Sequence, residues 1–216
     1  MKLGNTIIFG DSYSTYEGHI PEGYAVYYNG HRESPPDVSD VTKTWWHMLI
    51  SECGATLAQN NSWSGSTICY TGYDYTDRST TSSFICRFNK LVDEGFFKEN
   101  KVDSVLILGA TNDNWCQAPV GQLQYSDWSF ESLFFVLPAV CHFFNRLNEE
   151  LPDAEKVFIM NNGFKTAIVK GIRKACEHYG IKLIELDNTV DKENGHPTEK
   201  GMEDIKNQVR DALESF

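Results

Sequence analysis

The sequence has few positive charges and no long hydrophobic run. Lys and Arg together number 19 against 30 Asp and Glu, so the formal net charge of the 216 residues is −11. A surface of this sign repels phosphate backbones and anionic headgroups, and we therefore expect neither a nucleic-acid nor a membrane partner. The start of the chain lacks the apolar core of a secretory leader, which favours a cytoplasmic location.

The sequence also lacks the residue spacings of common metal and nucleotide sites. No CxxC pair and no H-x-x-x-H pair occurs, and "GDSYSTYEG" is neither G-x-G-x-x-G nor a P-loop. We therefore expect no metal and no cofactor. The cysteines are far apart, and we expect them to be free, buried thiols (Cys53, Cys69, Cys86, Cys116, Cys141 and Cys176).

Apolar runs of strand length alternate with amphipathic patterns along the chain. The runs cover 5–9, 102–108, 156–160 and 181–186, with a weaker one at 55–60. Near-continuous apolar strands are typical of parallel sheets buried on both faces. The sequence therefore predicts a single α/β domain over 1–216, with five parallel strands flanked by helices. One helix is expected over 129–151 with a kink at Pro138, and another places Met202, Ile205, Val209 and Leu213 on one face.

Three segments fit neither class and are predicted to be long loops over a functional edge. They cover 13–40, 66–82 and 113–128, and they are rich in Gly, Asp, Ser and aromatic residues. The aromatic residues argue against disorder and would suit the apolar faces of sugar rings (Tyr13, Tyr16, Tyr24, Tyr27, Tyr28, Tyr73, Tyr75, Trp115 and Trp128).

Residues suited to acyl transfer follow four of the five strands. The segments are "GDSYS", "NSWSGS", "GATND" and the one that carries His196. The carboxyl ends of parallel strands meet at one edge of a sheet, where ligands bind. At that edge Ser12 could act as a nucleophile and His196 as the base that removes its proton. The Ser12 amide, the Gly65 amide and the Asn112 side chain could donate to the developing oxyanion.

The same four segments, "FGDSYS", "NSWSGST", "GATND" and "GHPTEKG", resemble the sequence blocks of the SGNH (GDSL-type) hydrolases. This resemblance spans Gly10 to Gly201. It implies a flavodoxin-like three-layer α/β/α fold and an esterase, lipase or carbohydrate deacetylase. It also implies that Ser12 is the nucleophile, that His196 is the base, and that Ser12, Gly65 and Asn112 form the oxyanion hole. The nucleophile elbow G-x-S-x-G of another esterase fold is absent.

The acid that supports His196 is less well defined. The family usually has an aspartate three residues before the histidine, and this sequence has Glu193 there. We expect Glu193 to take that role, although Asp191, Asp187 or a backbone carbonyl could replace it.

The expected function is a serine ester hydrolase that removes an acetyl group from a saccharide or cleaves a small acyl ester. Side chains near the nucleophile and after the third long strand are candidate substrate contacts (Asp11, Tyr13, Asp113 and Trp115). The alternative is a noncatalytic carbohydrate or small-ligand binding module on the same fold.

Overall fold

Five parallel strands form the central sheet of this computed structural model, which describes residues 1–73 and 80–216. They are β1 (Asn5–Gly10), β2 (Thr56–Ser62), β3 (Ser104–Gly109), β4 (Glu155–Met160) and β5 (Lys182–Glu185). Their order is β2-β1-β3-β4-β5. All four pairings are parallel, which confirms the predicted fold class. Successive strands are added on one side of β1 and then on the other, so the topological switch point lies between β1 and β3. Open α/β sheets bind ligands at this position.

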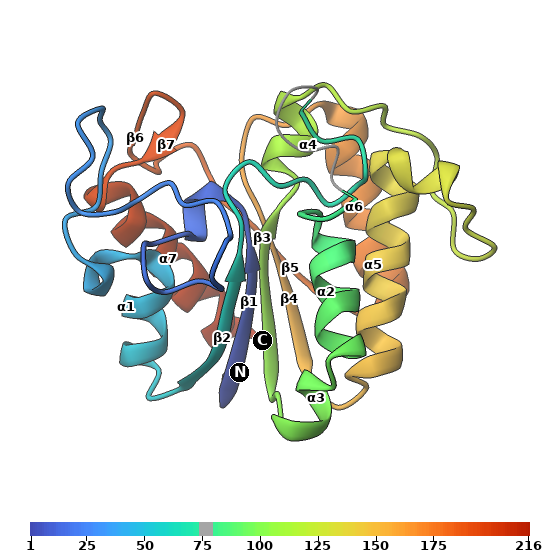
Figure 1. Cartoon of the computed structure of the whole chain (residues 1–216), viewed down its shortest axis with the longest axis horizontal. Coiled ribbons are helices and arrows are strands. Elements are labelled where there is room, and N and C mark those ends of the chain that lie inside the picture. The colour runs from blue at the N-terminus through green and yellow to red at the C-terminus, as the bar shows by residue number, and fades with distance from the viewer. Residues whose placement is uncertain (74–79) are drawn as a thin grey trace.

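Helices cover both faces of the sheet (Figure 1). One layer holds α1 (Trp45–Glu52) and α7 (Glu199–Ser215), and the other holds α2 (Phe84–Asp93), α5 (Val136–Glu150) and α6 (Thr166–Tyr179). Side chains alternate along β1: Ile8 packs in the core beneath α1 and α7, whereas Ile7 and Phe9 pack in the core beneath α2, α5 and α6. The apolar face predicted for the last helix is confirmed, because all four of its residues are buried.

The long helix expected over 129–151 is divided, so the predicted kink at Pro138 is wrong. A 3-10 turn, η3 (Glu131–Phe134), comes first, and Phe135 is extended with φ −99° and ψ 140°. Pro138 then lies in the first turn of α5, where its missing N–H breaks no helical hydrogen bond.

The short elements gather at the carboxyl edge of the sheet (Figure 1). They are η1 (Ser12–Ser14), α4 (Thr111–Trp115) and the hairpin of β6 (Lys192–Glu193) and β7 (His196–Pro197). Two others, η2 (Val41–Lys43) and α3 (Phe96–Glu99), precede α1 and follow α2. The rest of 13–40 and 113–128 is largely irregular, as expected. Residues 74–79 of the loop expected over 66–82, with Tyr75, lie outside the described residues.

Two further expectations concern thiols and membranes. The six cysteines are free as predicted, although Cys53 is exposed and only Cys69, Cys141 and Cys176 are buried. None of the helices in the described ranges is long and apolar enough to cross a bilayer.

Candidate active site

Ser12 projects from the turn that follows β1. Asp11 caps this turn by accepting a hydrogen bond from the Tyr13 amide at 3.0 Å. The strand ends at Gly10, where an added Cβ would lie 2.5 Å from the Ser14 side chain and 2.7 Å from Ser62 Oγ. Only glycine lets the turn fold back this tightly, so Gly10 fixes where the Ser12 hydroxyl points.

His196 reaches Ser12 from the hairpin of β6 and β7. The Ser12 Oγ and His196 Nε2 atoms are 2.9 Å apart. Asn194 and Gly195 form the hairpin loop with φ 49° and 80°. Positive φ at both central residues is what a tight two-residue hairpin requires, and Asn-Gly is the pair that adopts it most readily. The loop sequence therefore directs the histidine ring toward the nucleophile.

Aromatic rings enclose His196. Tyr27 stacks on the imidazole at 3.8 Å with an interplanar angle of 7°. Tyr13 and Trp115 each lie 5.6 Å from it, measured between ring centroids. Burial among these rings lowers the pKa of His196 to about 4. The imidazole is therefore neutral at pH 7 and can accept a proton from Ser12.

A backbone carbonyl, rather than a carboxylate, lies next to the other ring nitrogen. His196 Nδ1 is 3.3 Å from the carbonyl oxygen of Asn194. Glu193 pairs with His196 across the hairpin, but its side chain is exposed, and among the described residues it forms no hydrogen bond to the ring. The carboxylates of Asp191 and Asp187 accept from Thr198 and Thr189 instead. The expected contact between Glu193 and His196 is thus not made, and the geometry is that of the backbone-carbonyl alternative.

The three donors predicted for the oxyanion hole follow the ends of β1, β2 and β3. Within the part of the chain that the structure describes, the Ser12 and Gly65 amides have no acceptor. The Asn112 amide group is oriented at both ends: its Nδ2 donates to the Ser66 carbonyl at 3.0 Å, and its Oδ1 accepts from the Tyr73 hydroxyl at 3.0 Å. One N–H of Asn112 remains available, because an amide nitrogen carries two.

A comparison with protein families shows which family the chain belongs to. A model of the GDSL-like lipase/acylhydrolase family matches residues 5–213. The chain belongs to this family.

Solved structures of GDSL-like proteins are similar to the chain over its whole length. A Bacteroides ovatus protein assigned to the GDSL-like lipases is 38% identical with a TM-score of 0.89, and the match covers 99% of both chains. A second, from Bacteroides uniformis, is 36% identical with a TM-score of 0.88 and covers 99% of this chain and 97% of that one. An acetyl xylan esterase from Butyrivibrio proteoclasticus shares the fold at 17% identity, with a TM-score of 0.64 over 98% of this chain and 63% of that one. No curated protein sequence matches.

Three of the four side chains expected to contact substrate are buried in this GDSL-like protein. The Asp113 carboxylate accepts from the amides of Ile68 and Cys69 at 2.9 and 3.1 Å, which fixes the segment after Gly65. Asp11 and Tyr13 are also fully buried. In this structure all three therefore hold other parts of the site. Trp115 is 39% exposed and faces the catalytic edge beside His196.

A chain of polar contacts that the sequence analysis did not identify holds the histidine hairpin. Lys192 Nζ donates to the Asn161 side chain at 2.7 Å, and Asn161 donates to the Tyr13 hydroxyl at 3.2 Å. The Tyr13 hydroxyl donates in turn to the Gly195 carbonyl at 2.5 Å. Asn161 directly follows β4, so the rule that polar residues collect at strand ends would have found it.

The second residue missed from the sequence is Arg87 of α2, which is 1% exposed. Its guanidinium donates to the Gly10 carbonyl at 3.2 Å, to Ser66 Oγ at 3.1 Å and to the Asn61 side chain at 3.0 Å. It also donates to the carbonyls of Asn61 and Ser82. Burial lowers the pKa of Arg87 to about 9, and the group still carries its charge at pH 7. One cation thus connects the ends of β1 and β2 and the turn that contains Gly65.

Asp11 and Thr111 are incompletely hydrogen-bonded beneath the site. The Asp11 Oδ2 and the Thr111 hydroxyl are buried without a hydrogen bond of normal geometry among the described residues. Burial raises the pKa of Asp11 to about 7, although the Tyr13 amide opposes this rise. The folded protein therefore binds a proton at Asp11 under conditions in which the unfolded chain has released it.

We predict that replacing Asp11 with Asn removes part of the pH dependence of stability. Because the folded pKa is raised, the contribution of this proton is complete below the unfolded pKa of about 4 and is lost as pH rises through about 7. The part of the wild-type unfolding free energy that depends on Asp11 should fall by a few kcal/mol, on the order of 1.4 kcal/mol per pKa unit, between pH 5 and 8. Urea unfolding at both pH values should therefore show that the stability of Asp11→Asn relative to the wild type is higher at pH 8 than at pH 5. Asp40 caps η2 in the same way but is exposed, so Asp40→Asn should behave as wild type.

We predict that Arg87→Met destabilises the protein by about 3–5 kcal/mol, because it leaves several buried acceptors without a donor. Arg87→Lys should cost less, since it keeps the charge and three of the donors. The control is Arg173→Met, which removes an exposed pair with Glu185 and should cost much less than Arg87→Met. Urea unfolding measures all three. Equal losses for Arg87→Met and Arg173→Met would contradict the role given to Arg87.

Proposed function

We propose that this chain is a serine ester hydrolase that acts through an acyl-enzyme. The observation that carries the proposal is the 2.9 Å contact between Ser12 Oγ and His196 Nε2 at the carboxyl edge of the sheet. The family match and the available N–H groups of Ser12, Gly65 and Asn112 support the same reaction.

In the first half-reaction, Ser12 Oγ attacks the acyl carbonyl carbon while His196 Nε2 takes its proton. The Ser12 and Gly65 amides and Asn112 Nδ2 donate to the oxyanion that forms. The carbonyl of Asn194 accepts from Nδ1–H, which selects the tautomer with a free Nε2 and holds the ring through the proton transfer. The ester C–O bond then breaks, and the alcohol leaves with the proton from Nε2.

In the second half-reaction, a water molecule takes the place of the alcohol. His196 accepts a proton from the water as its oxygen attacks the acyl carbon, and the same donors stabilise the second oxyanion. Return of the proton to Ser12 Oγ releases the carboxylic acid and restores the enzyme. Both half-reactions thus balance with proton transfers between Ser12, His196, the leaving alcohol and the water molecule.

The proposed substrate is an acetylated saccharide, with a small acyl ester as the simplest substitute. Trp115 and Tyr27 flank His196 and present aromatic surface beside the nucleophile. Aromatic rings fit the apolar faces of sugars and orient them through shape.

We predict that Ser12→Ala lowers kcat for p-nitrophenyl acetate by at least about 10³-fold, because the remaining donors cannot replace a nucleophile. A fluorophosphonate probe should label the wild type at Ser12 and leave Ser12→Ala unlabelled. Hydrolysis that persists in Ser12→Ala would contradict the mechanism. Failure of the wild type both to hydrolyse esters and to react with the probe would instead favour a binding protein.

We predict that Glu193→Gln retains kcat within about threefold, because the Asn194 carbonyl orients the ring; loss of an essential triad carboxylate costs about 10⁴-fold. Asp191→Asn is the matched variant for the other nearby acid. The same acetate-release assay measures both. A loss of 100-fold or more in either variant would assign that carboxylate to the triad.

We predict an unusually flat acid limb in the pH profile. His196 must be neutral to act as a base, and its pKa of about 4 keeps it neutral down to about pH 5. The value of kcat/KM should therefore fall less than about twofold between pH 8 and 5.5, whereas an unshifted histidine would lose about tenfold. The profile of Asp11→Asn, measured in parallel, separates any step near pH 7 that belongs to Asp11. A tenfold fall in both proteins would contradict the buried environment of His196.

A further inference from the structure

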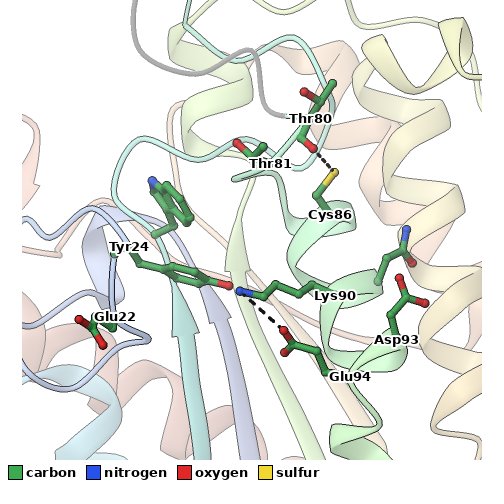
Figure 2. A pocket seen from close by; sticks show the side chains of 11 residues that line it. Glu22, Tyr24, Thr80, Thr81, Cys86, Lys90, Asp93 and Glu94 are labelled. Atoms are coloured by element: carbon green, nitrogen blue, oxygen red, sulfur yellow. Dashed lines mark hydrogen bonds and ion pairs between the residues drawn. The ribbon is translucent and has the colours of Figure 1, made fainter.

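A groove of about 690 Å³ lies between α2 and the loop that carries Tyr24. Its volume is in the range of small-molecule binding sites. Figure 2 shows Thr80 and Thr81 at one end and Glu94 toward the other, with Tyr24 pointing across at α2. Helix α2 contributes residues from Cys86 to Asp93, seven steps of about 1.5 Å, so the groove follows about 10 Å of helix and ends at Glu94. Its shape suits an elongated ligand.

An aromatic pair forms one wall of this groove. The rings of Tyr24 and Trp63 are 4.4 Å apart, and both side chains are half-buried. Lys90 Nζ lies 5.8 Å from the centre of the Tyr24 ring and pairs with Glu94 at 3.9 Å (Figure 2). A rigid, partly exposed aromatic wall of this kind can bind an apolar ring face with little loss of conformational entropy.

The opposite wall carries hydrogen-bonding groups. Asn89, Lys90 and Asp93 occupy spacings of one, three and four residues on α2, and they reach the same groove. Among the described residues, the carboxylates of Glu22, Asp93 and Glu94 line the groove against one ammonium group, that of Lys90. Carboxylates accept hydrogen bonds from hydroxyl groups and repel anions. The groove therefore favours a neutral ligand with many hydroxyl groups.

The groove adjoins the catalytic edge through the backbone. Trp63 directly follows β2, its amide donates to the Gly10 carbonyl at 3.1 Å, and Gly65 comes two residues later. The Ser64 amide donates to the carbonyl of Ala25 at 2.9 Å, which joins the Tyr24 loop to the same turn. A ligand in the groove would thus lie beside the residues that hold Ser12 and Gly65.

We infer that this groove binds the unesterified part of a neutral oligosaccharide whose acetylated sugar lies at Ser12. The position of the ester rests on the proposed function, but the presence of the groove does not. Tyr24 and Trp63 would stack on a sugar ring, while Asn89 and Asp93 would bind its hydroxyl groups.

The binding test uses Ser12→Ala and sugars without an ester, so that it needs no catalysis. Isothermal titration calorimetry with xylohexaose, cellohexaose and the anionic hexagalacturonate should give a Kd below about 1 mM for at least one neutral sugar and no binding of the anion. Tyr24→Ala in the same background should weaken that Kd at least about tenfold, which is the loss of about 1.4 kcal/mol. Tyr125 is an exposed ring stacked on His178 at 3.9 Å, and Tyr125→Ala is the matched control that should bind as before.

The kinetic test uses the active enzyme. Tyr24→Ala should raise KM for an acetylated xylo-oligosaccharide about tenfold and leave turnover of p-nitrophenyl acetate within about twofold, because the small ester does not reach the groove. That unchanged turnover also shows that the variant is folded.

Three outcomes would overturn the inference: no binding of either neutral hexasaccharide, equal binding by Tyr24→Ala, or equal binding of hexagalacturonate. A Tyr24-dependent dimer without sugar binding would likewise reassign the groove to a second copy of the chain. If no ester is hydrolysed, the proposed function fails, and the calorimetry still decides whether the groove binds a sugar.

Discussion

The geometry of the active edge depends on one buried cation, the guanidinium of Arg87. Its partners are the Gly10 carbonyl, the Asn61 backbone and side chain, the Ser66 hydroxyl and the Ser82 carbonyl, which belong to four separate segments of chain. Burying a charge costs several kcal/mol, and the cost is offset here because the five donors of arginine meet five acceptors, three of them at the ends of β1 and β2. Because Gly10 and Ser66 are close in sequence to Ser12 and Gly65, the same contacts restrict the distance between the proposed nucleophile and a proposed oxyanion donor. The helix α2, which contains no proposed catalytic residue, thereby determines the shape of the site.

The histidine side of the site has a different support. A backbone carbonyl next to Nδ1 fixes the tautomer of His196 but carries only a dipole, so it stabilises the imidazolium less than a carboxylate would. The stacked Tyr27 and the surrounding rings exclude water, which lowers the proton affinity further. The imidazole of His196 therefore stays unprotonated in mildly acidic solution, but its protonation releases little free energy. A larger share of transition-state stabilisation then falls to the oxyanion donors, whose positions Arg87, Asp113 and Tyr73 fix.

Much of the fold and the position of the site could be predicted from the sequence, because both follow from local patterns. Buried parallel strands give continuous apolar runs, and polar residues directly after them must meet at one edge; this placed Ser12, Gly65 and Asn112 together. Asn194-Gly195 before His196 is also a local hairpin signal, although the sequence analysis did not use it to predict the hairpin of β6 and β7. Arg87 could not be found, since an arginine in an amphipathic helix is ordinarily exposed, and its burial depends on acceptors far away in sequence. Asp11, Asp113 and Glu193 show the same limit: strand ends reveal which residues are near the edge, but not whether a carboxylate points to substrate, to backbone or to solvent.

The two faces of α2 connect recognition with catalysis. Its buried face carries Arg87, which holds the turn around Gly65, and its exposed face carries Asn89 and Asp93, which line the groove. Trp63 belongs to both regions, because its ring packs on Tyr24 while its amide is bonded to Gly10. A sugar bound in the groove would therefore contact the segment from Trp63 to Gly65, whose amide is a proposed oxyanion donor. Binding energy from the distant part of the ligand can then restrict the motion of the reacting ester at Ser12, which is how remote contacts raise kcat as well as affinity. A small ester gains none of this restriction, so a difference between the two substrates in kcat, and not in KM alone, is the kinetic sign that the groove and the nucleophile act as one site.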